Sequence, residues 1–199
     1  MRILVTGAQG FIGSHVVHQL LDQGHQIITF DHYSGIQIDH SDEYYTNVSS
    51  FVGDVRDSVA VNEAVALSNG VIHLAGVLGT QETINNPLPA VETNIFGGLN
   101  VFQAVKAHKK RAVYIAVGNH TMNNSYSITK TTAERFALMF NKEFGTQIAI
   151  VRGLNAYGPG QKDKPVRKII PNFVLPALKG EKIQIYGDGT QIMDLIYVV

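Results

Sequence analysis

Tyr126 and Lys130 stand four positions apart at the start of a segment with helical periodicity, residues 127–144. Side chains at i and i+4 share one face of an α-helix. An ammonium group beside a phenol favours the phenolate and lowers the phenol pKa toward working pH, where a general base is most effective. The pair could therefore remove a proton from a hydroxyl group. Alone, such a pair more often marks a surface helix with an extended lysine, so its position in the fold decides the interpretation.

A glycine motif could hold a phosphate-containing cofactor. Gly7, Gly10 and Gly13 lie between the first predicted strand and the first predicted helix. In such a unit the first glycine permits a tight turn, the second lets the backbone approach a pyrophosphate, and the third lets helix and strand pack closely. Phe11 and Ile12 open the helix, whose N-terminus offers free N–H groups to phosphates.

An acidic residue follows at the spacing that a dinucleotide site needs. Asp31 ends the second predicted strand, 18 residues after Gly13. A carboxylate there accepts hydrogen bonds from ribose hydroxyls and repels a 2′-phosphate. The alternative is a set of turn glycines and a solvated aspartate. The order of strand, glycines, helix and acid favours NAD over NADP.

The elements that must position these residues follow from the apolar pattern. Short Val- and Ile-rich runs predict strands at 3–5, 27–30, 50–52, 71–74, 112–117 and 147–151. Patterns with steps of 3 and 4 predict helices at 11–21, 57–67, 88–108 and 127–144. Strands that alternate with helices of this length predict βαβ units. The expected fold class is therefore α/β, a Rossmann-type doubly wound parallel sheet.

The character of the chain changes after Leu154. The glycines at 158 and 160 break the pattern, a helix is predicted at 166–178, and a strand at 183–186. We expect an NAD-binding Rossmann domain over 1–153 and the beginning of a small substrate-binding region over 154–199. The apolar segment 195–199 would be a poor natural terminus, so we expect further sequence beyond it.

Composition narrows the function classes. The chain has 199 residues, with 16 Lys and Arg balanced by 16 Asp and Glu, and no Cys. This balance argues against nucleic-acid binding, and the lack of cysteine excludes a disulfide scaffold, a thiolate zinc site and a cysteine nucleophile. No apolar run approaches the ~18 residues that a membrane span needs. His15 and His18 have no third ligand nearby in sequence, so we expect no metal site. We predict a cytoplasmic protein without a membrane partner.

Taken together, the motifs resemble the extended short-chain dehydrogenase/reductases, the NAD-dependent nucleotide-sugar epimerase/dehydratase family, over essentially all 199 residues. Beyond the glycine motif and the Tyr-x-x-x-Lys pair, the resemblance is carried by GDVRD at 53–57, HLAG at 73–76, TNIFGGLN at 93–100 and RGLNAYGP at 152–159. It implies that Asp54 holds the adenine amino group, that Asn94 supports the active site and that Lys130 holds the nicotinamide ribose. The implied cofactor contacts are Gly7, Gly10, Phe11, Ile12, Gly13, Asp31, Asp54, Val55, Leu74, Ala75, Gly76, Asn94, Tyr126 and Lys130.

The chain departs from the family pattern beside the catalytic pair. The family places a Ser or Thr just after the fifth strand, whereas residues 116–118 carry no hydroxyl. Thr121 and Ser125 are the available substitutes, and we predict that Thr121 is the third catalytic residue. His120, in the same short loop, could act as an acid or contact the substrate. Residues 116–125 contain no Asp or Glu, which argues against 4,6-dehydratase and decarboxylase chemistry.

The resemblance also implies a nucleotide-sugar site. Met193 stands where the family has an Arg that grips the pyrophosphate, and a thioether cannot replace that clamp. We expect Asn155, Arg167 and Lys168 to contact the substrate, although the basic residues could also form a solvated loop.

The resulting prediction is NAD-dependent epimerisation of a nucleotide-activated sugar, a UDP-hexose, at C4 through a transient 4-keto intermediate. An NAD(P)H-dependent 4-ketoreductase and a catalytically weak NAD-binding regulatory protein are the alternatives. The resemblance further implies a homodimer that pairs through the helices predicted at 88–108 and 126–144.

Overall fold

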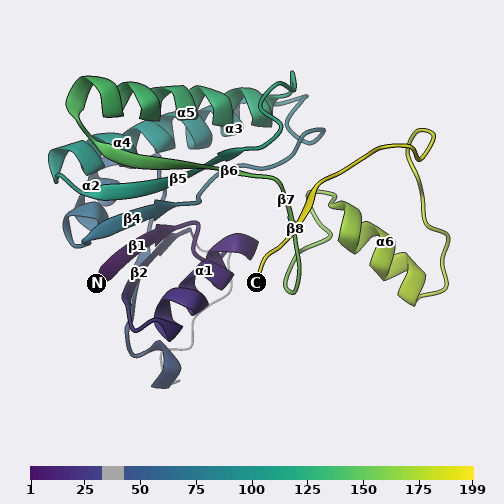
Figure 1. Ribbon diagram of the computed structural model, residues 1–199, viewed down its shortest axis with the longest axis horizontal. Coiled ribbons are helices and arrows are strands. Elements are labelled where there is room, and N and C mark those ends of the chain that lie inside the picture. The colour runs from purple at the N-terminus through teal and green to yellow at the C-terminus, as the bar shows by residue number, and fades with distance from the viewer. Residues whose placement is uncertain (33–42) are drawn as a thin grey trace.

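Six parallel strands form the central sheet of the computed structural model, which describes residues 1–32 and 43–199 (Figure 1). In sheet order they are β3 (Val48–Val52), β2 (Gln26–Asp31), β1 (Arg2–Thr6), β4 (Gly70–His73), β5 (Arg111–Val117) and β6 (Gln147–Gly153). The order runs outward in both directions from the β1–β4 pair. In such sheets the ligand binds outside the carboxyl ends of the strands at this switch point. The predicted doubly wound α/β fold is confirmed.

Helices cover the two faces of the sheet unequally (Figure 1). The helical elements are α1 (Phe11–Asp22), the short 3-10 turn η1 (Glu43–Tyr45), α2 (Ser58–Ala66), α3 (Leu88–Ala90), the π-helix η2 (Val91–Gly97), α4 (Gly98–Ala107), α5 (Ser125–Phe144) and α6 (Ile169–Leu178). α2, α4 and α5 pack over the larger core, and α1 packs over β1 and β2 on the other face. None of the described helices is long and apolar enough to cross a membrane.

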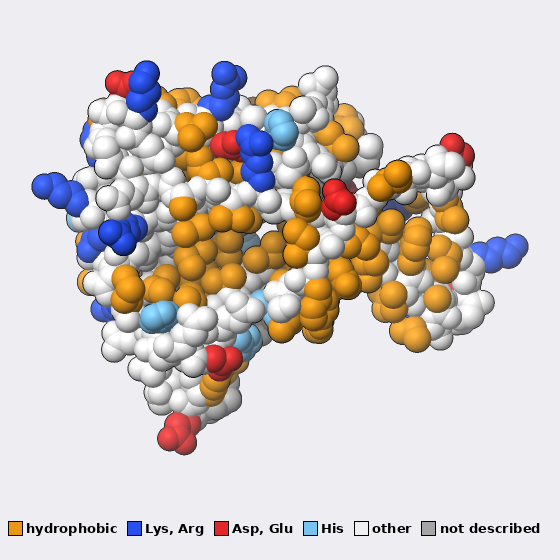
Figure 2. Space-filling view, viewed as in Figure 1, with side chains coloured by type: hydrophobic (Ala, Val, Ile, Leu, Met, Phe, Trp, Pro, Cys, Tyr) orange, Lys and Arg blue, Asp and Glu red, His pale blue; other side chains and the backbone are white. Residues whose placement is uncertain are grey.

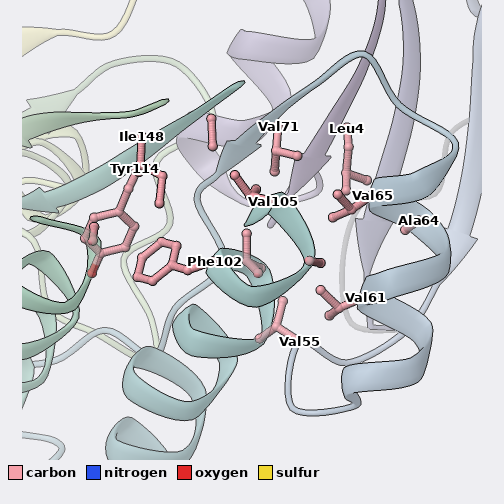
Figure 3. Packing of buried hydrophobic residues seen from close by; sticks show 14 of the residues in the cluster. Leu4, Val55, Val61, Ala64, Val65, Val71, Phe102, Val105, Tyr114 and Ile148 are labelled. Carbon is pink, nitrogen blue, oxygen red and sulfur yellow. The ribbon is translucent and has the colours of Figure 1, made fainter. Parts of the chain in front are cut away.

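Part of the α1 face of the sheet remains open. Beside α1, apolar side chains of β1, β4, β5 and β6 line a shallow depression, among them Ile3, Ile72, Val113 and Ala149. Figure 2 shows this region as a patch of hydrophobic side chains. The opposite face is closed, because Leu4, Val71, Phe102 and Tyr114 are buried in one cluster there (Figure 3). The two faces therefore contribute very differently to the core.

One row of side chains crosses the whole sheet on the closed face. In strand order it consists of Phe51, Phe30, Thr6, His73, Tyr114 and Ile150, each residue in register with the next. The row brings Thr6, which precedes the glycine motif, to within two strands of Tyr114. Its centre is polar, since the Thr6 hydroxyl and His73 Nδ1 are 2.7 Å apart.

The segment after β6 begins with a separate pair of strands. β7 (Asn155–Tyr157) and β8 (Leu195–Tyr197) pair in parallel, and α6 lies in the segment between them (Figure 1). The strand predicted at 183–186 is wrong. Ile183 and Ile185 are exposed and no neighbouring strand pairs with them among the described residues, so the alternating pattern alone does not make a strand. The division into domains at residue 153 stays a prediction.

Candidate active site

The glycine motif after β1 has no room for a side chain at Gly7 and Gly13. Gly7 has φ +70°, and a Cβ there would lie 2.7 Å from the Ala75 backbone nitrogen. A Cβ on Gly13 would lie 2.0 Å from the Gly7 carbonyl oxygen. Only glycine fits at these two positions, so the loop and the start of α1 pack closely. Gly10 is the N-cap of α1 and supplies no side chain to its N–H groups, which leaves them to an anion.

Asp31 is held beside that loop. One carboxylate oxygen accepts a hydrogen bond from the Gln9 N–H at 2.9 Å, and the other accepts one from the His32 N–H at 2.9 Å. Asp31 ends β2, which is hydrogen-bonded to β1. The acid therefore lies where a ribose following the pyrophosphate would place its hydroxyls.

Asp54 is already paired within the chain. Arg56 contacts both of its carboxylate oxygens, with the shortest distance at 2.6 Å, and also contacts Glu92 at 3.1 Å. The hydrogen bond from Arg56 lowers the pKa of Asp54. Val55 is buried in the main core, where a Cβ on Gly97 would lie 2.6 Å from its Cγ2. The side chain of Val55 therefore anchors the segment 53–57 in the core rather than facing outward.

Leu74, Ala75 and Gly76 follow β4 and form the floor of the site. The Ala75 N–H donates to the Thr6 hydroxyl at 3.3 Å, which links the ends of β1 and β4. A Cβ on Gly76 would lie 3.0 Å from Asn94 Oδ1 and 3.9 Å from Lys130 Nζ. The floor therefore reaches Lys130, one of the residues predicted to be catalytic.

Asn94 connects this floor to α5. Its Oδ1 accepts from the Val77 N–H at 2.8 Å, and its Nδ2 donates to the Val77 carbonyl at 3.1 Å and to Thr129 Oγ1 at 2.9 Å. The Thr129 hydroxyl donates to the carbonyl of Ser125 at 2.7 Å, with that of Tyr126 at 3.1 Å. Asn94 lies in the π-helix η2, a conformation often found at functional sites. Its amide supports the site through protein contacts.

The predicted catalytic pair lies in the first turns of α5. Asn124 caps this helix by accepting from the Ser127 N–H at 2.9 Å, so Tyr126 is in its first turn. Lys130 is 3% exposed, and its Nζ lies 4.4 Å from the centroid of the Tyr114 ring. Burial lowers the pKa of Lys130 to about 7 and raises the pKa of Tyr126. The expectation that the ammonium lowers the Tyr126 pKa is wrong for the protein by itself, because burial favours the neutral form of both groups.

The loop between β5 and α5 carries no hydroxyl at the position that the resemblance implies. A Cβ on Gly118 would lie 2.4 Å from Leu154 Cδ2 and 3.0 Å from the Gly153 carbonyl oxygen, so Leu154 occupies that place. Thr121 is exposed in the following turn. The Ser125 hydroxyl donates to the Thr83 carbonyl at 3.1 Å and is engaged there. Thr121 as the third catalytic residue stays a prediction.

The predicted substrate residues lie in the segment after β6. Asn155 Nδ2 donates to the Asp194 carbonyl at 3.1 Å, which ties β7 to β8. The Arg167 N–H donates to Glu82 at 3.2 Å, and its guanidinium contacts the Tyr186 hydroxyl. Lys168 is the N-cap of α6, and burial lowers its pKa. Glu82 lies in the loop between β4 and α3, so the start of the segment that carries Arg167 and Lys168 contacts that loop.

A comparison with protein families decides the class. The chain matches the NAD dependent epimerase/dehydratase family over residues 3–199. It belongs to that family. Members of the family depend on NAD, and the glycine loop, the uncapped N-terminus of α1 and Asp31 fit that cofactor. The predicted family and the predicted cofactor are confirmed.

Relatives within the epimerase/dehydratase family act on different nucleotide sugars. The chain is 31% identical to a UDP-N-acetyl-alpha-D-glucosaminuronate decarboxylase of Bacillus cytotoxicus, over 99% of the chain and 67% of that protein. It resembles the structure of a UDP-glucose 4-epimerase from Thermotoga maritima with UDP-glucose, with a TM-score of 0.90 and 27% identity over 100% of the chain and 70% of that structure. A UDP-glucose 4-epimerase from Thermus thermophilus, solved with NAD, gives a TM-score of 0.85 and 25% identity over 100% of the chain and 71% of that structure.

Sequence reasoning missed three residues of this site. The Tyr114 ring faces the Lys130 ammonium, the Thr129 hydroxyl accepts a hydrogen bond from the Asn94 amide, and the Leu154 side chain fills the space beside Gly118. The signal for Thr129 was its place inside the Tyr-x-x-x-Lys motif. Tyr114 and Leu154 are recognised only once the strand register and the end of β6 are known.

Proposed function

We propose that the chain catalyses NAD-dependent epimerisation of a nucleotide-activated sugar at C4, with a UDP-hexose as substrate and a transient 4-keto intermediate. The observation that carries this proposal is the approach of Lys130, one helical turn after Tyr126 in α5, to Gly76 just beyond the carboxyl end of β4. Family membership supplies the class, nucleotide-sugar epimerases and dehydratases.

In this mechanism Tyr126 takes the proton from the sugar 4-hydroxyl. The glycine loop and Asp31 would hold NAD, which would supply the hydride acceptor for C4 and the hydride donor for the opposite face of the turned 4-keto sugar, and Tyr126 returns its proton to the sugar oxygen. Burial lowers the pKa of Lys130 to about 7, so both its charged and its neutral form are accessible near neutral pH. In its charged form, Lys130 favours the Tyr126 phenolate that accepts the proton of the sugar hydroxyl, and the Asn94–Thr129 hydrogen bond fixes the helical turn between the two residues.

The acidic residues near the pair support epimerisation over elimination or decarboxylation. Residues 116–125 contain no Asp or Glu. Glu134, one turn after Lys130, is paired with Arg152 at 2.6 Å and is directed to β6. Neither elimination nor decarboxylation therefore has a free acid on the loop 116–125. A 4-ketoreductase shares every remaining group, and it differs in releasing its oxidised cofactor.

The proposal includes the two regions and the subunit pairing. The Rossmann part, 1–153, would hold the cofactor, and 154–199 would begin the substrate-binding region with Asn155, Arg167 and Lys168. Exposed apolar side chains on η2 and α5, among them Phe96, Ile128 and Leu138, would support a homodimer through the α4–α5 surface.

The test begins with the NAD released when the purified protein is denatured. Near-stoichiometric NAD supports a cofactor recycled in place, whereas an empty protein that binds NADH supports the reductase. Turnover of UDP-hexoses is then compared between the native protein, Tyr126→Phe and the control Tyr44→Phe, which alters the exposed η1 turn. We expect Tyr126→Phe to lose turnover by orders of magnitude with NAD affinity little changed, and Tyr44→Phe to retain it. Near-native turnover by Tyr126→Phe would refute the mechanism.

A further inference from the structure

The ammonium of Lys130 rests on an aromatic face inside the protein. Its Nζ lies 4.4 Å from the centroid of the Tyr114 ring, and both side chains are almost fully buried, at 3% and 1% exposure. Among the described residues no carboxylate forms an ion pair with Lys130. A cation over the face of a ring is attracted by the ring quadrupole, and the attraction is strongest where water is excluded.

The ring of Tyr114 is held from several sides. It stacks on His73 with a centroid distance of 5.7 Å. Phe102 packs edge-on against it with a centroid distance of 5.5 Å (Figure 3). The Tyr114 hydroxyl donates to the backbone carbonyl of Lys130 at 3.2 Å. Tyr114 therefore contacts the same residue twice, at the ammonium through its ring and at the backbone through its hydroxyl.

We propose that Tyr114 is a positioning residue for the reaction, whose ring holds the Lys130 ammonium beside Gly76 while its hydroxyl fixes the turn of α5 that carries Lys130. The inference rests on the proposed function in so far as Lys130 assists Tyr126. The ring would stabilise the charged form of the buried Lys130 whichever reaction the chain catalyses.

The surroundings of this contact contain few other charges. His73 on β4 is buried and neutral, since burial lowers its pKa to about 3. Tyr126 and Glu134 on α5 are the remaining titratable groups that act on Tyr114, and Glu134 is paired with Arg152. With no carboxylate paired to Lys130 in the described part of the chain, the Tyr114 ring is the aromatic group that faces its ammonium.

Fluorination separates this role from packing. Fluorine atoms withdraw charge from the face of a ring with little change in its shape. We would compare Tyr114→Phe with variants that carry 4-fluoro- and 3,4,5-trifluorophenylalanine at position 114. The matched control places trifluorophenylalanine at position 102, since Phe102 is buried in the same cluster and makes no contact with Lys130 that would stabilise a charge.

Two measurements follow the series, the titration of Lys130 by carbon-13 NMR of labelled lysine and the turnover of UDP-hexoses. Lys130→Met identifies the signal. Tyr114→Phe loses the hydroxyl but keeps the ring, so it is the reference for the fluorinated variants. Relative to Tyr114→Phe, we expect the trifluoro variant to lower the Lys130 titration midpoint by about one pH unit, a tenfold change in its protonation equilibrium. Turnover should fall in the same order, about tenfold at the end of the series.

Failure of the Tyr114 role and failure of the proposed function would give different results. A Lys130 midpoint that stays constant through the series, or that moves equally in the Phe102 control, would overturn the role of Tyr114. If the midpoint shifts but the native protein epimerises no nucleotide sugar, the ring–ammonium contact stands and the proposed function fails. Thermal unfolding midpoints within a few degrees of native would show that the variants are folded.

Discussion

Replacing Asn94 by alanine should remove the hydrogen bonds that join the segment after β4 to α5. The substitution removes three hydrogen bonds, two to Val77 and one to Thr129. A typical intramolecular hydrogen bond contributes about 0.5–1.5 kcal/mol, and a buried N–H left without a partner costs about 1–3 kcal/mol. Val77 is only partly buried, so water offsets part of this cost. We expect the free energy of unfolding to fall by roughly 2–4 kcal/mol.

The assay is urea denaturation at 25 °C, followed by NAD titration of the folded variants. Asn62→Ala is the control, because Asn62 bonds to His108 on the surface and should change stability by less than about 0.5 kcal/mol. Asn94→Asp keeps the shape but loses both N–H donors, so we expect it to be at least as destabilising as alanine. A loss below about 0.5 kcal/mol for Asn94→Ala would refute the view that this amide joins the loop to α5.

Two further predictions concern packing and charge. Gly13→Ala should weaken NAD binding at least tenfold and destabilise the fold by about 1–3 kcal/mol, because its Cβ would lie 2.0 Å from the Gly7 carbonyl oxygen. Calorimetry measures the binding and thermal unfolding the stability. The control is Gly98→Ala, whose Cβ would make only an ordinary contact at 3.6 Å. Removing Arg152 leaves the buried Glu134 without its ion-pair partner. A double-mutant cycle of Arg152→Gln and Glu134→Gln in urea should therefore give a coupling energy of about 1–2 kcal/mol, less than that of a fully buried pair because Arg152 is half exposed. Strictly additive effects of the two substitutions would contradict this coupling.

The sheet and the cofactor loop could be predicted because their signals are local. Buried parallel strands give continuous apolar runs, and Gly7 and Gly13 are required by close backbone contacts that follow from their place between strand and helix. The Tyr-x-x-x-Lys spacing likewise places both residues on α5. In each case neighbours in the sequence determine the geometry.

Other features depend on contacts between distant segments and could not be predicted. The π-helix at η2 has the same periodicity of apolar residues as a regular helix, and the close approach of Gly97 to Val55 is set by packing. Tyr114 reaches Lys130 only because α5 packs against β5. The pKa of Tyr126 rises rather than falls because the burial of its side chain is a tertiary property.

The row of side chains that crosses the sheet fixes a length in the site. Thr6 leads into the glycine loop, Tyr114 lies beneath Lys130, and His73 stands between them on the intervening strand. Neighbouring strands are spaced about 4.8 Å apart by their hydrogen bonds, so the two ends of this short row are separated by roughly 10 Å. That separation cannot stretch without breaking the sheet. A ligand that lies over both the glycine loop and Lys130 must therefore be long enough to cover a distance that the backbone hydrogen bonds set. The sheet thus selects ligands by their length.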